Sequence, residues 1–169
     1  MVTIRALAAA DANAFRDLRL EALRDSPAAF SSSYEDEARF AREDFVRRIE
    51  PSDESWVLGA FDSQNVMVAC IGWYRFRGGK VAHKSHVWGM YVTPPHRRKG
   101  IARALIAEAL ARARAHAGIT QIELFVATGN GAAASLYESL GFERVAVHPN
   151  ALRVDGRYIN EELFVLRIA

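Results

Sequence analysis

Residues 86–127 constrain the fold of this 169-residue chain more than any other segment. They begin with the β-branched and aromatic run "HVWGMYV", continue through an apolar arc over residues 101–117, and end with "QIELFVA". The first and last runs have the composition of strands, and the middle one repeats its apolar residues at helical spacing. Two neighbouring strands joined by a helix lie parallel, so this segment predicts a β-α-β crossover.

The remaining sequence extends this unit into a mixed sheet within one domain, residues 1–169. The predicted order is β-α-α-β-β-β-α-β-α-β-β, an α/β (α+β) fold of about seven strands and four helices. Asp155 and Gly156 predict a hairpin turn before the last strand, and Ser32 with Glu35 resembles a capping box at the second helix. The predicted strands are 2–7, 56–61, 66–76, 86–92, 121–127, 142–148 and 157–168, and the predicted helices are 11–24, 31–49, 101–117 and 131–140.

Composition excludes several classes of protein. The formal net charge is only +2, which is too small for a general nucleic-acid binder. The single cysteine, Cys70, rules out an internal disulfide and gives no metal cluster, and it lies in an apolar run where a buried, inert thiol is expected. No run of about 18 apolar residues suggests a membrane span, and the N-terminal sequence does not resemble a signal peptide. We therefore expect a soluble cytoplasmic protein without a metal.

The turn between the strand at 86–92 and the following helix predicts an anion site. Arg97, Arg98 and Lys99 precede Gly100 directly before the helix. The positive end of a helix dipole disfavours cations, so three of them there suggest that a negative group binds. Free N–H groups of the first helical turn and a glycine without Cβ would suit a phosphate. Neither a P-loop nor a dinucleotide-binding motif is present, which argues against those two kinds of phosphate site. The alternative to an anion site is a solvated basic helix start.

Two sequence motifs indicate which kind of phosphate group this turn would bind. Residues 97–102, "RRKGIA", resemble the Arg/Gln-x-x-Gly-x-Gly/Ala signature of the GCN5-related N-acetyltransferases (GNAT). Residues 130–142, "NGAAASLYESLGF", resemble the family pattern Asn-x-x-Ala-x-x-Leu-Tyr-x-x-x-Gly-Phe. Both motifs occur in the family's order, and the resemblance covers about residues 86–145. It implies the GNAT fold and acetyl-CoA as the cofactor.

The resemblance also implies a role for each matching residue. Backbone amides of residues 98–102 would hold the pyrophosphate, Asn130 would contact the pantetheine arm, and Tyr137 would lie near the sulfur. A backbone N–H near Met90 would stabilise the oxyanion, with Gly89 bending the strand. Simpler alternatives are a helix N-cap for Asn130 and core packing for Tyr137. The implied cofactor-binding residues are Met90, Tyr91, Val92, Arg97, Arg98, Lys99, Gly100, Ile101, Ala102, Arg103, Asn130, Ala133 and Tyr137.

Acetyl transfer to an amine requires two proton transfers. The ammonium group has a pKa of about 10 and must lose a proton, and the departing thiolate must be protonated or stabilised. His86 is the leading candidate for the first role, in place of the glutamate of many relatives, although a structural histidine is the alternative. Tyr137 is the candidate for the second role. Further candidates for relaying the proton or attracting the cationic amine are Glu35, Glu161 and Glu162.

These observations predict an acetyl-CoA-dependent N-acetyltransferase in which a primary amine, expected to be a small molecule, attacks the thioester directly. Alternatives are a noncatalytic acyl-CoA-binding regulatory module, a protein or peptide N-acetyltransferase, and a DNA-binding role for the basic helix. A homodimer is possible by resemblance, and no membrane or nucleic-acid partner is expected. The predicted acceptor-binding residues are Phe30, Tyr34, Trp88 and Tyr158.

Overall fold

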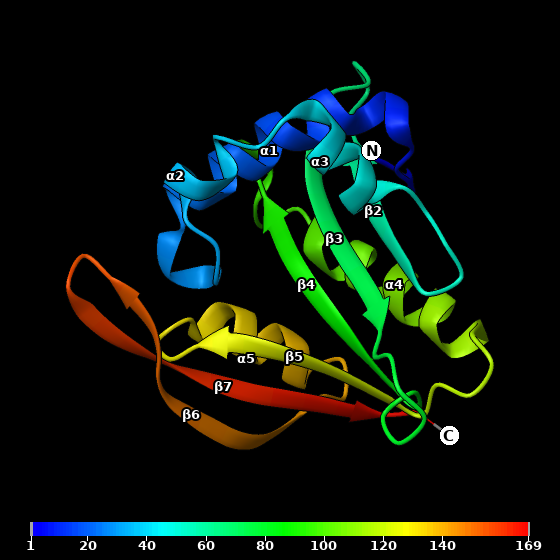
Figure 1. Cartoon of the computed structure of the whole chain (residues 1–169), viewed down its shortest axis with the longest axis vertical. Helices are drawn as coiled ribbons and strands as arrows, with labels where there is room; N and C mark the ends of the chain where they lie inside the picture. The colour runs from blue at the N-terminus through cyan, green and yellow to red at the C-terminus, as the bar shows by residue number, and fades with distance from the viewer. Residues whose placement is uncertain (1, 169) are drawn as a thin grey trace.

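A seven-stranded sheet runs through the molecule in the order β1-β2-β3-β4-β5-β7-β6 (Figure 1). The computed structural model describes residues 2–168. All neighbouring strands are antiparallel except β4 and β5, which are parallel. The strands are β1 (Thr3–Ala6), β2 (Ser55–Phe61), β3 (Met67–Arg75), β4 (Lys84–Val92), β5 (Gln121–Ala127), β6 (Glu143–Val154) and β7 (Arg157–Arg167).

Helices cover both faces of this sheet and divide the apolar core in two. On one face, α1 and α3 pack with residues such as Phe15 and Phe45 against the sheet. On the other face, α4 contributes Leu105 and Ile106 to a larger cluster, which also contains Tyr137 of α5. Figure 1 shows α1, α2 and α3 in front of the strands and α4 behind them. The helices are α1 (Ala12–Asp25), α2 (Tyr34–Glu37), α3 (Arg42–Ile49), α4 (Ile101–Ala115) and α5 (Gly131–Glu138).

The predicted β-α-β crossover and mixed sheet are confirmed. Lys84 pairs with Gln121 and His86 with Glu123 in parallel register. The Asp155-Gly156 turn is also present, with φ values of 48° and 78°, and joins β6 to β7. A two-residue turn with both φ angles positive matches the twist of the strands that it connects.

One predicted helix is wrong in its extent. The segment 31–49 forms two helices, because α2 ends at Glu37 and α3 begins only at Arg42. The carboxylate of Asp44 accepts a hydrogen bond from the backbone N–H of Ala41 at 2.8 Å, which starts a new helix at this point. The cap of α2 is Ser33, which accepts from the N–H of Asp36, and not Ser32.

A bulge in β4 has the largest consequence for the rest of the molecule. Tyr91 pairs with Cys70 and Trp88 with Gly72, so Gly89 and Met90 together oppose the single residue Ile71. Gly89 adopts φ +64°, a conformation that glycine reaches without steric penalty. A bulge of this kind bends the strand and increases its twist.

Gly72, opposite this bulge, makes space for an aromatic side chain. A Cβ at Gly72 would overlap the indole ring of Trp88. Both groups lie in the middle of paired strands, where the backbone has little freedom to move away. The position of Trp88 therefore depends on the absence of a Cβ at Gly72.

Replacing Gly72 with alanine should therefore lower the free energy of unfolding by about 1–3 kcal/mol, the usual cost of overpacking. Urea denaturation would measure the change. Gly79→Ala is the matched control, because a Cβ there would meet no atom within 4 Å. Equal stability of the Gly72→Ala protein and the wild type would show that Trp88 is not held in this position.

Candidate functional site

The strands β4 and β5 separate after three paired residues. Their pairing ends at His86 opposite Glu123, while β5 continues in register with β7 as far as Ala127 opposite Glu161. The bulge at Gly89 carries the remainder of β4 away from its neighbour, and Figure 1 shows the two strands diverging. Backbone groups on the facing edges of the two strands are thereby left available to a ligand.

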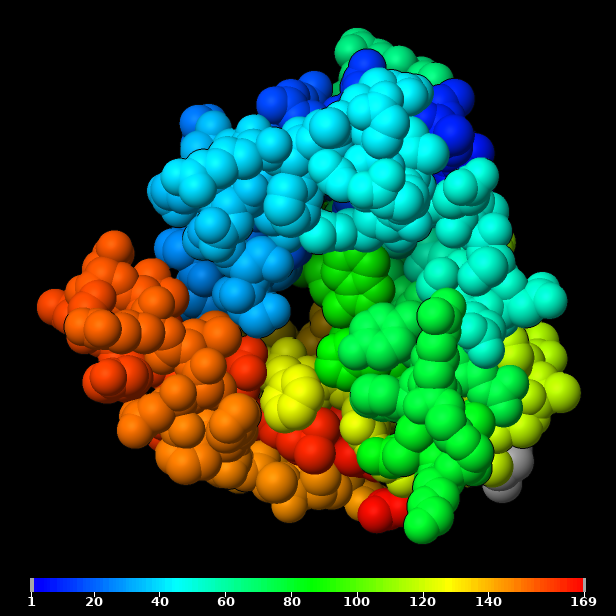
Figure 2. All heavy atoms as spheres, viewed as in Figure 1, coloured from blue at the N-terminus to red at the C-terminus, as the bar shows by residue number. Residues whose placement is uncertain are grey.

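Two adjoining cavities occupy this separation. The first lies between β4, β5 and α5, and the second opens toward α1, α3 and the segment that precedes α2. In Figure 2 the second cavity is the hollow near the centre of the molecule, between the blue helices, the green residues of β3 and β4, and the orange hairpin. Because the cavities share walls, a molecule in one can contact a molecule in the other. The shared wall residues are Ala29, Phe30, Val87, Trp88, Gly89 and Phe125.

Tyr137 lines the first cavity and also belongs to the apolar core. It is 7% exposed, and its ring contacts that of Phe142 edge to face at 5.6 Å. Burial raises the pKa of its phenol above the ordinary value of 10. Its hydroxyl makes no hydrogen bond within residues 2–168, so it can donate one to a ligand. Packing and a chemical role are thus compatible for this side chain.

Asn130 begins α5 at the rim of the first cavity. Its side-chain oxygen accepts a hydrogen bond from the backbone N–H of Ala133 at 3.3 Å. The N-cap interpretation of Asn130 therefore holds. Its side-chain NH₂ group stays available as a donor.

The basic turn before α4 has the geometry of an anion cradle. Arg98 and Gly100 adopt positive φ values of 60° and 80°, and Gly100 is the N-cap of the 15-residue α4. The first N–H groups of a helix have no partner within the helix, so they can bind an anion together with the partial positive charge of the dipole. A side chain at Gly100 would not clash with protein atoms, but it would be strained at this φ.

The cations of this turn divide into two groups. Arg97 donates from Nε to the carbonyl of Val92 at 2.9 Å and forms an ion pair with Asp25, so it fastens the turn to β4 and α1. Arg103 donates to Ser139 Oγ at 2.7 Å and ties α4 to α5. Arg98 and Lys99 are exposed, and neither forms an ion pair within the described chain. These two side chains are the ones available to an anion.

His86 and Glu161 lie on the walls of the second cavity, whose volume is about 670 Å³. His86 contacts the rings of Tyr74 and Phe125 at centroid distances of 5.3 and 5.9 Å. Burial lowers the pKa of His86 below 6.5, partly opposed by the charge of Glu123, so it is largely neutral at pH 7. Burial raises the pKa of Glu161, partly opposed by His148, which pairs with it across β6 and β7. Either group could accept a proton.

A buried ion triad forms the wall of the second cavity beside α1. Arg19 donates to Glu37 from Nε at 3.0 Å and from NH2 at 2.9 Å, and Arg48 contacts the same carboxylate at 2.9 Å. Burial alone would raise the pKa of Glu37, but the hydrogen bonds and charges of the two arginines outweigh it and hold the pKa below its usual value. The sequence analysis missed this triad. Its signal was Arg19 itself, at the helical spacing of the buried residues Phe15 and Leu23.

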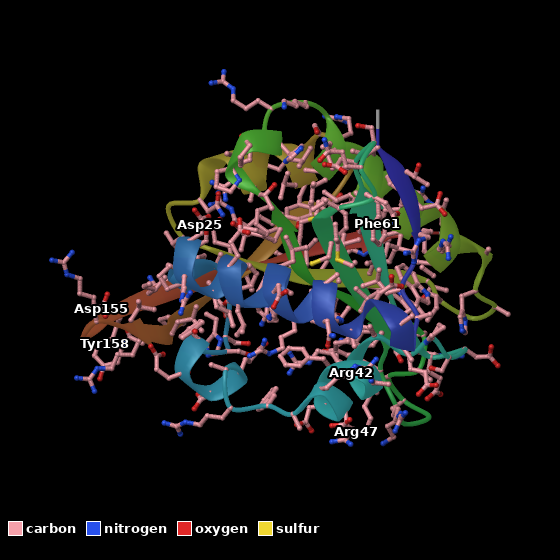
Figure 3. The ribbon with its side chains drawn as sticks, turned by 90° about the horizontal axis from the view of Figure 1, so that it is seen from above. Asp25, Arg42, Arg47, Phe61, Asp155 and Tyr158 are labelled. Carbon is pink, nitrogen blue, oxygen red and sulfur yellow. The ribbon has the colours of Figure 1, made fainter. Side chains whose placement is uncertain are left out.

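Two of the four predicted acceptor-binding residues line the cavities, and the other two lie outside them. Phe30 and Trp88 lie between the two cavities. Tyr34 lies on α2 with its ring beneath the guanidinium of Arg24, in a neighbouring depression. Tyr158 is 64% exposed on the β6–β7 hairpin, which projects from the body of the molecule (Figure 3).

The remaining predicted residues are partly engaged elsewhere. The hydroxyl of Tyr91 donates to Glu21 at 3.1 Å on the α1 side of the sheet, and Glu162 forms an ion pair with Arg144.

Other predicted residues lie in the core or line a cavity. Ile101 is buried in the core, Ala102 packs against that core, and Val92 is also buried. Met90 and Ala133 line the first cavity. Glu35 lines the depression beside α2.

The described residues contain no group of three or more His, Cys, Asp or Glu side chains placed to hold a metal ion. Cys70 is buried, and burial raises the pKa of its thiol to about 12, so the thiol stays protonated. Within residues 2–168, no helix has the length and apolar character needed to cross a membrane.

Comparison with known proteins gives consistent results. The model of the acetyltransferase (GNAT) family matches residues 15–142. The mycothiol acetyltransferase of Salinispora tropica is 31% identical over 158 residues, which cover 88% of this chain and 47% of that protein. The chain therefore spans about half the length of this curated relative.

Solved structures share the whole architecture. An acetyltransferase of the GNAT family from Streptococcus pneumoniae superposes with a TM-score of 0.88 at 21% identity, covering 99% of this chain and 100% of that one. The yncA protein of Salmonella typhimurium, solved with its cofactor acetyl-CoA, gives a TM-score of 0.82 at 21% identity, covering 100% and 95% of the two chains. At these identities the likeness establishes the fold.

The triad makes a prediction about stability. Glu37→Gln leaves the buried guanidinium of Arg19 and the half-buried one of Arg48 without their carboxylate, so the free energy of unfolding should fall by about 3–5 kcal/mol at pH 7, as measured by urea denaturation. Because folding lowers the pKa of Glu37, the wild-type contribution is complete above the ordinary value of 4.5 and is lost as pH falls through the lowered value.

Glu43→Gln is the control for this experiment, because Glu43 is exposed in the first turn of α3. Its replacement should change stability by no more than about 0.5 kcal/mol. Equal effects of the two substitutions would contradict the structural role of Glu37.

Proposed function

The chain belongs to the acetyltransferase (GNAT) family, and from this membership we propose that it transfers the acetyl group of acetyl-CoA to the primary amine of a small molecule. The observation that carries the proposal is the pair of adjoining cavities where β4 separates from β5. Tyr137 lines the first cavity, His86 and Glu161 line the second, and Gly89 of the bulge lines both. A donor and an acceptor can therefore meet at the bulge from opposite directions.

The residues of the first cavity and of the basic turn suit acetyl-CoA. The turn from Arg98 to Ala102 offers free backbone N–H groups at the positive end of α4, which is the arrangement that binds a pyrophosphate. Arg98 and Lys99 would add countercharge. The open edges of β4 and β5 would hydrogen-bond to the amide groups of the pantetheine arm, with Asn130 as a further donor.

Acetyl-CoA supplies a thioester, so the amine nitrogen forms the new C–N bond, the C–S bond breaks, and coenzyme A leaves as the thiol. His86, largely neutral at pH 7, would take the proton from the attacking amine directly or through water. A backbone N–H of the bulge near Met90 would stabilise the negative charge that develops on the carbonyl oxygen. Tyr137 would donate a hydrogen bond or a proton to the departing sulfur. The buried thiol of Cys70 offers no competing nucleophile.

Release of thiol from acetyl-CoA with a panel of small amines tests this function. At least one amine should give saturable release of one thiol per N-acetyl product, detected by mass spectrometry. If coenzyme A binds but no amine accelerates thiol release, the chain is a noncatalytic acyl-CoA-binding module, and the proposal is wrong.

Removing the hydroxyl of Tyr137 should separate catalysis from binding. In Tyr137→Phe the ring still packs against Phe142. We expect kcat to fall at least about 100-fold, the low end for a group that assists proton transfer, while the affinity for coenzyme A changes less than about threefold. Steady-state kinetics and calorimetric titration with coenzyme A measure the two effects. An unchanged kcat would exclude the proposed role of Tyr137.

The pH dependence should identify the base. Since the pKa of His86 is lowered, kcat/KM should rise with pH as this group loses its proton below pH 6.5, and His86→Ala should remove this limb. Glu161→Gln is the matched test of the other candidate. If the limb survives in His86→Ala and disappears in Glu161→Gln, then Glu161 is the base.

A further inference from the structure

Arg19 carries a donor that the protein leaves unused. Its side chain is 6% exposed, and its NH1 nitrogen is buried without a hydrogen-bond partner in residues 2–168. Nε and NH2 are both held by Glu37, so the guanidinium plane is fixed. NH1 lies 4.0 Å from the position that a Cβ would take at Gly89. A buried, unpaired donor is costly, and one at this bulge suggests that a ligand completes its bonding.

The wall that contains Arg19 has an excess of positive charge. Arg19 and Arg48 share the single carboxylate of Glu37, so two cations face one anion. Both arginines line the second cavity. The guanidinium of Arg19 stacks over Phe30 at 4.7 Å, and that of Arg48 lies 5.9 Å from the ring centre of Trp88. These aromatic faces keep the charges in place without neutralising them.

The strands contribute groups of the other polarity to the same cavity. Glu161 of β7, His148 of β6 and His86 of β4 line it, whereas Arg19 and Arg48 come from the helices α1 and α3. Cations from the helices and a carboxylate from the sheet suit a molecule that carries both an anionic group and an amine. The shared wall formed by Phe30, Trp88 and Phe125 is apolar, so it suits a hydrocarbon side chain on the same molecule.

We propose that the acceptor is an amino acid with an apolar side chain, whose carboxylate binds Arg19 and Arg48. The amine then lies beside the Gly89 bulge, on the side of His86 and Glu161. An α-amino acid fits because its two polar groups are one carbon apart and NH1 lies next to the bulge. This assignment of substrate class rests on the proposed acetyltransferase function.

Pairs of acceptors that differ only in the carboxylate test the proposal. L-Phenylalanine is compared with 2-phenylethylamine, and L-leucine with 3-methylbutylamine, in thiol release from acetyl-CoA. The amino acid of at least one pair should have a kcat/KM at least about tenfold higher, because a site built to bind a charged group discriminates against the analogue that lacks it. Equal or higher values for both plain amines would overturn the proposal.

Arg48 and Arg47 provide a matched pair of variants. Arg48 is 27% exposed in the cavity wall, whereas Arg47 is 71% exposed, pairs with Asp44 and lies at the outer edge of the molecule (Figure 3). Arg48→Gln should reduce the preference for the amino acid at least about fivefold, and Arg48→Lys, which keeps the charge, should retain part of it. Arg47→Gln should leave the preference unchanged. Equal losses in Arg48→Gln and Arg47→Gln would contradict a carboxylate site.

A binding measurement separates this inference from the proposed function. Calorimetric titration of L-phenylalanine and 2-phenylethylamine into the protein saturated with coenzyme A does not require turnover. If no amine is acetylated, the proposed function fails, while tighter binding of L-phenylalanine than of 2-phenylethylamine still supports the carboxylate site. If the amines are acetylated but the two compounds bind equally, the carboxylate site is absent.

Discussion

The separation of β4 from β5 is the constraint on which the rest of the site depends. A parallel pair would normally continue its hydrogen bonds to the ends of both strands, and here it stops at His86 opposite Glu123. The positive φ of Gly89 allows two residues of β4 to oppose Ile71 alone, which bends the strand away from its neighbour. The same bend positions Gly89 and Met90 on a wall of the first cavity. Gly89 lines both cavities, so the bulge lies where they adjoin.

Arginines with fixed partners organise both sides of this opening. Arg97 ties the basic turn to the end of β4 and to α1, so the start of α4 and the strand keep a constant relation. Arg19 and Arg48 tie α1 and α3 to the carboxylate of Glu37 on α2. Buried ion pairs add little net stability compared with apolar packing, but removing one partner is expensive. Their effect in this structure is to hold the guanidinium groups in fixed positions beside the cleft.

The sequence predicts the sheet better than it predicts the cleft. Period-two strands, the crossover and the Asp155-Gly156 turn are local patterns, and each is present in the structure. The break between α2 and α3 was missed, because apolar residues at helical spacing continue through it while Asp44 captures the N–H of Ala41. Helix propensity and apolar periodicity give no sign that a side chain will take a backbone N–H from the helix in this way.

Motifs mark parts of the candidate site in the sequence, whereas contacts between distant segments leave no such mark. The turn at residues 97–102 and the helix with Tyr137 carry motifs; the turn leads into α4 at Gly100, and Tyr137 lines the first cavity. Arg19, Glu37 and Arg48 come from three separate helices, and no spacing in the sequence connects them. The exposure of Tyr158 was likewise not predictable, since an aromatic residue on a predicted strand gives no indication that it will lie on an exposed hairpin.

A crystal structure of the protein with acetyl-CoA tests the central claim most directly. The account predicts the pyrophosphate on the backbone amides of residues 98–102, the pantetheine arm between β4 and β5, and the thioester carbonyl roughly 3 Å from a backbone N–H of the Gly89–Met90 bulge. A cofactor bound outside the separation of these two strands, or a thioester remote from the bulge, would contradict it.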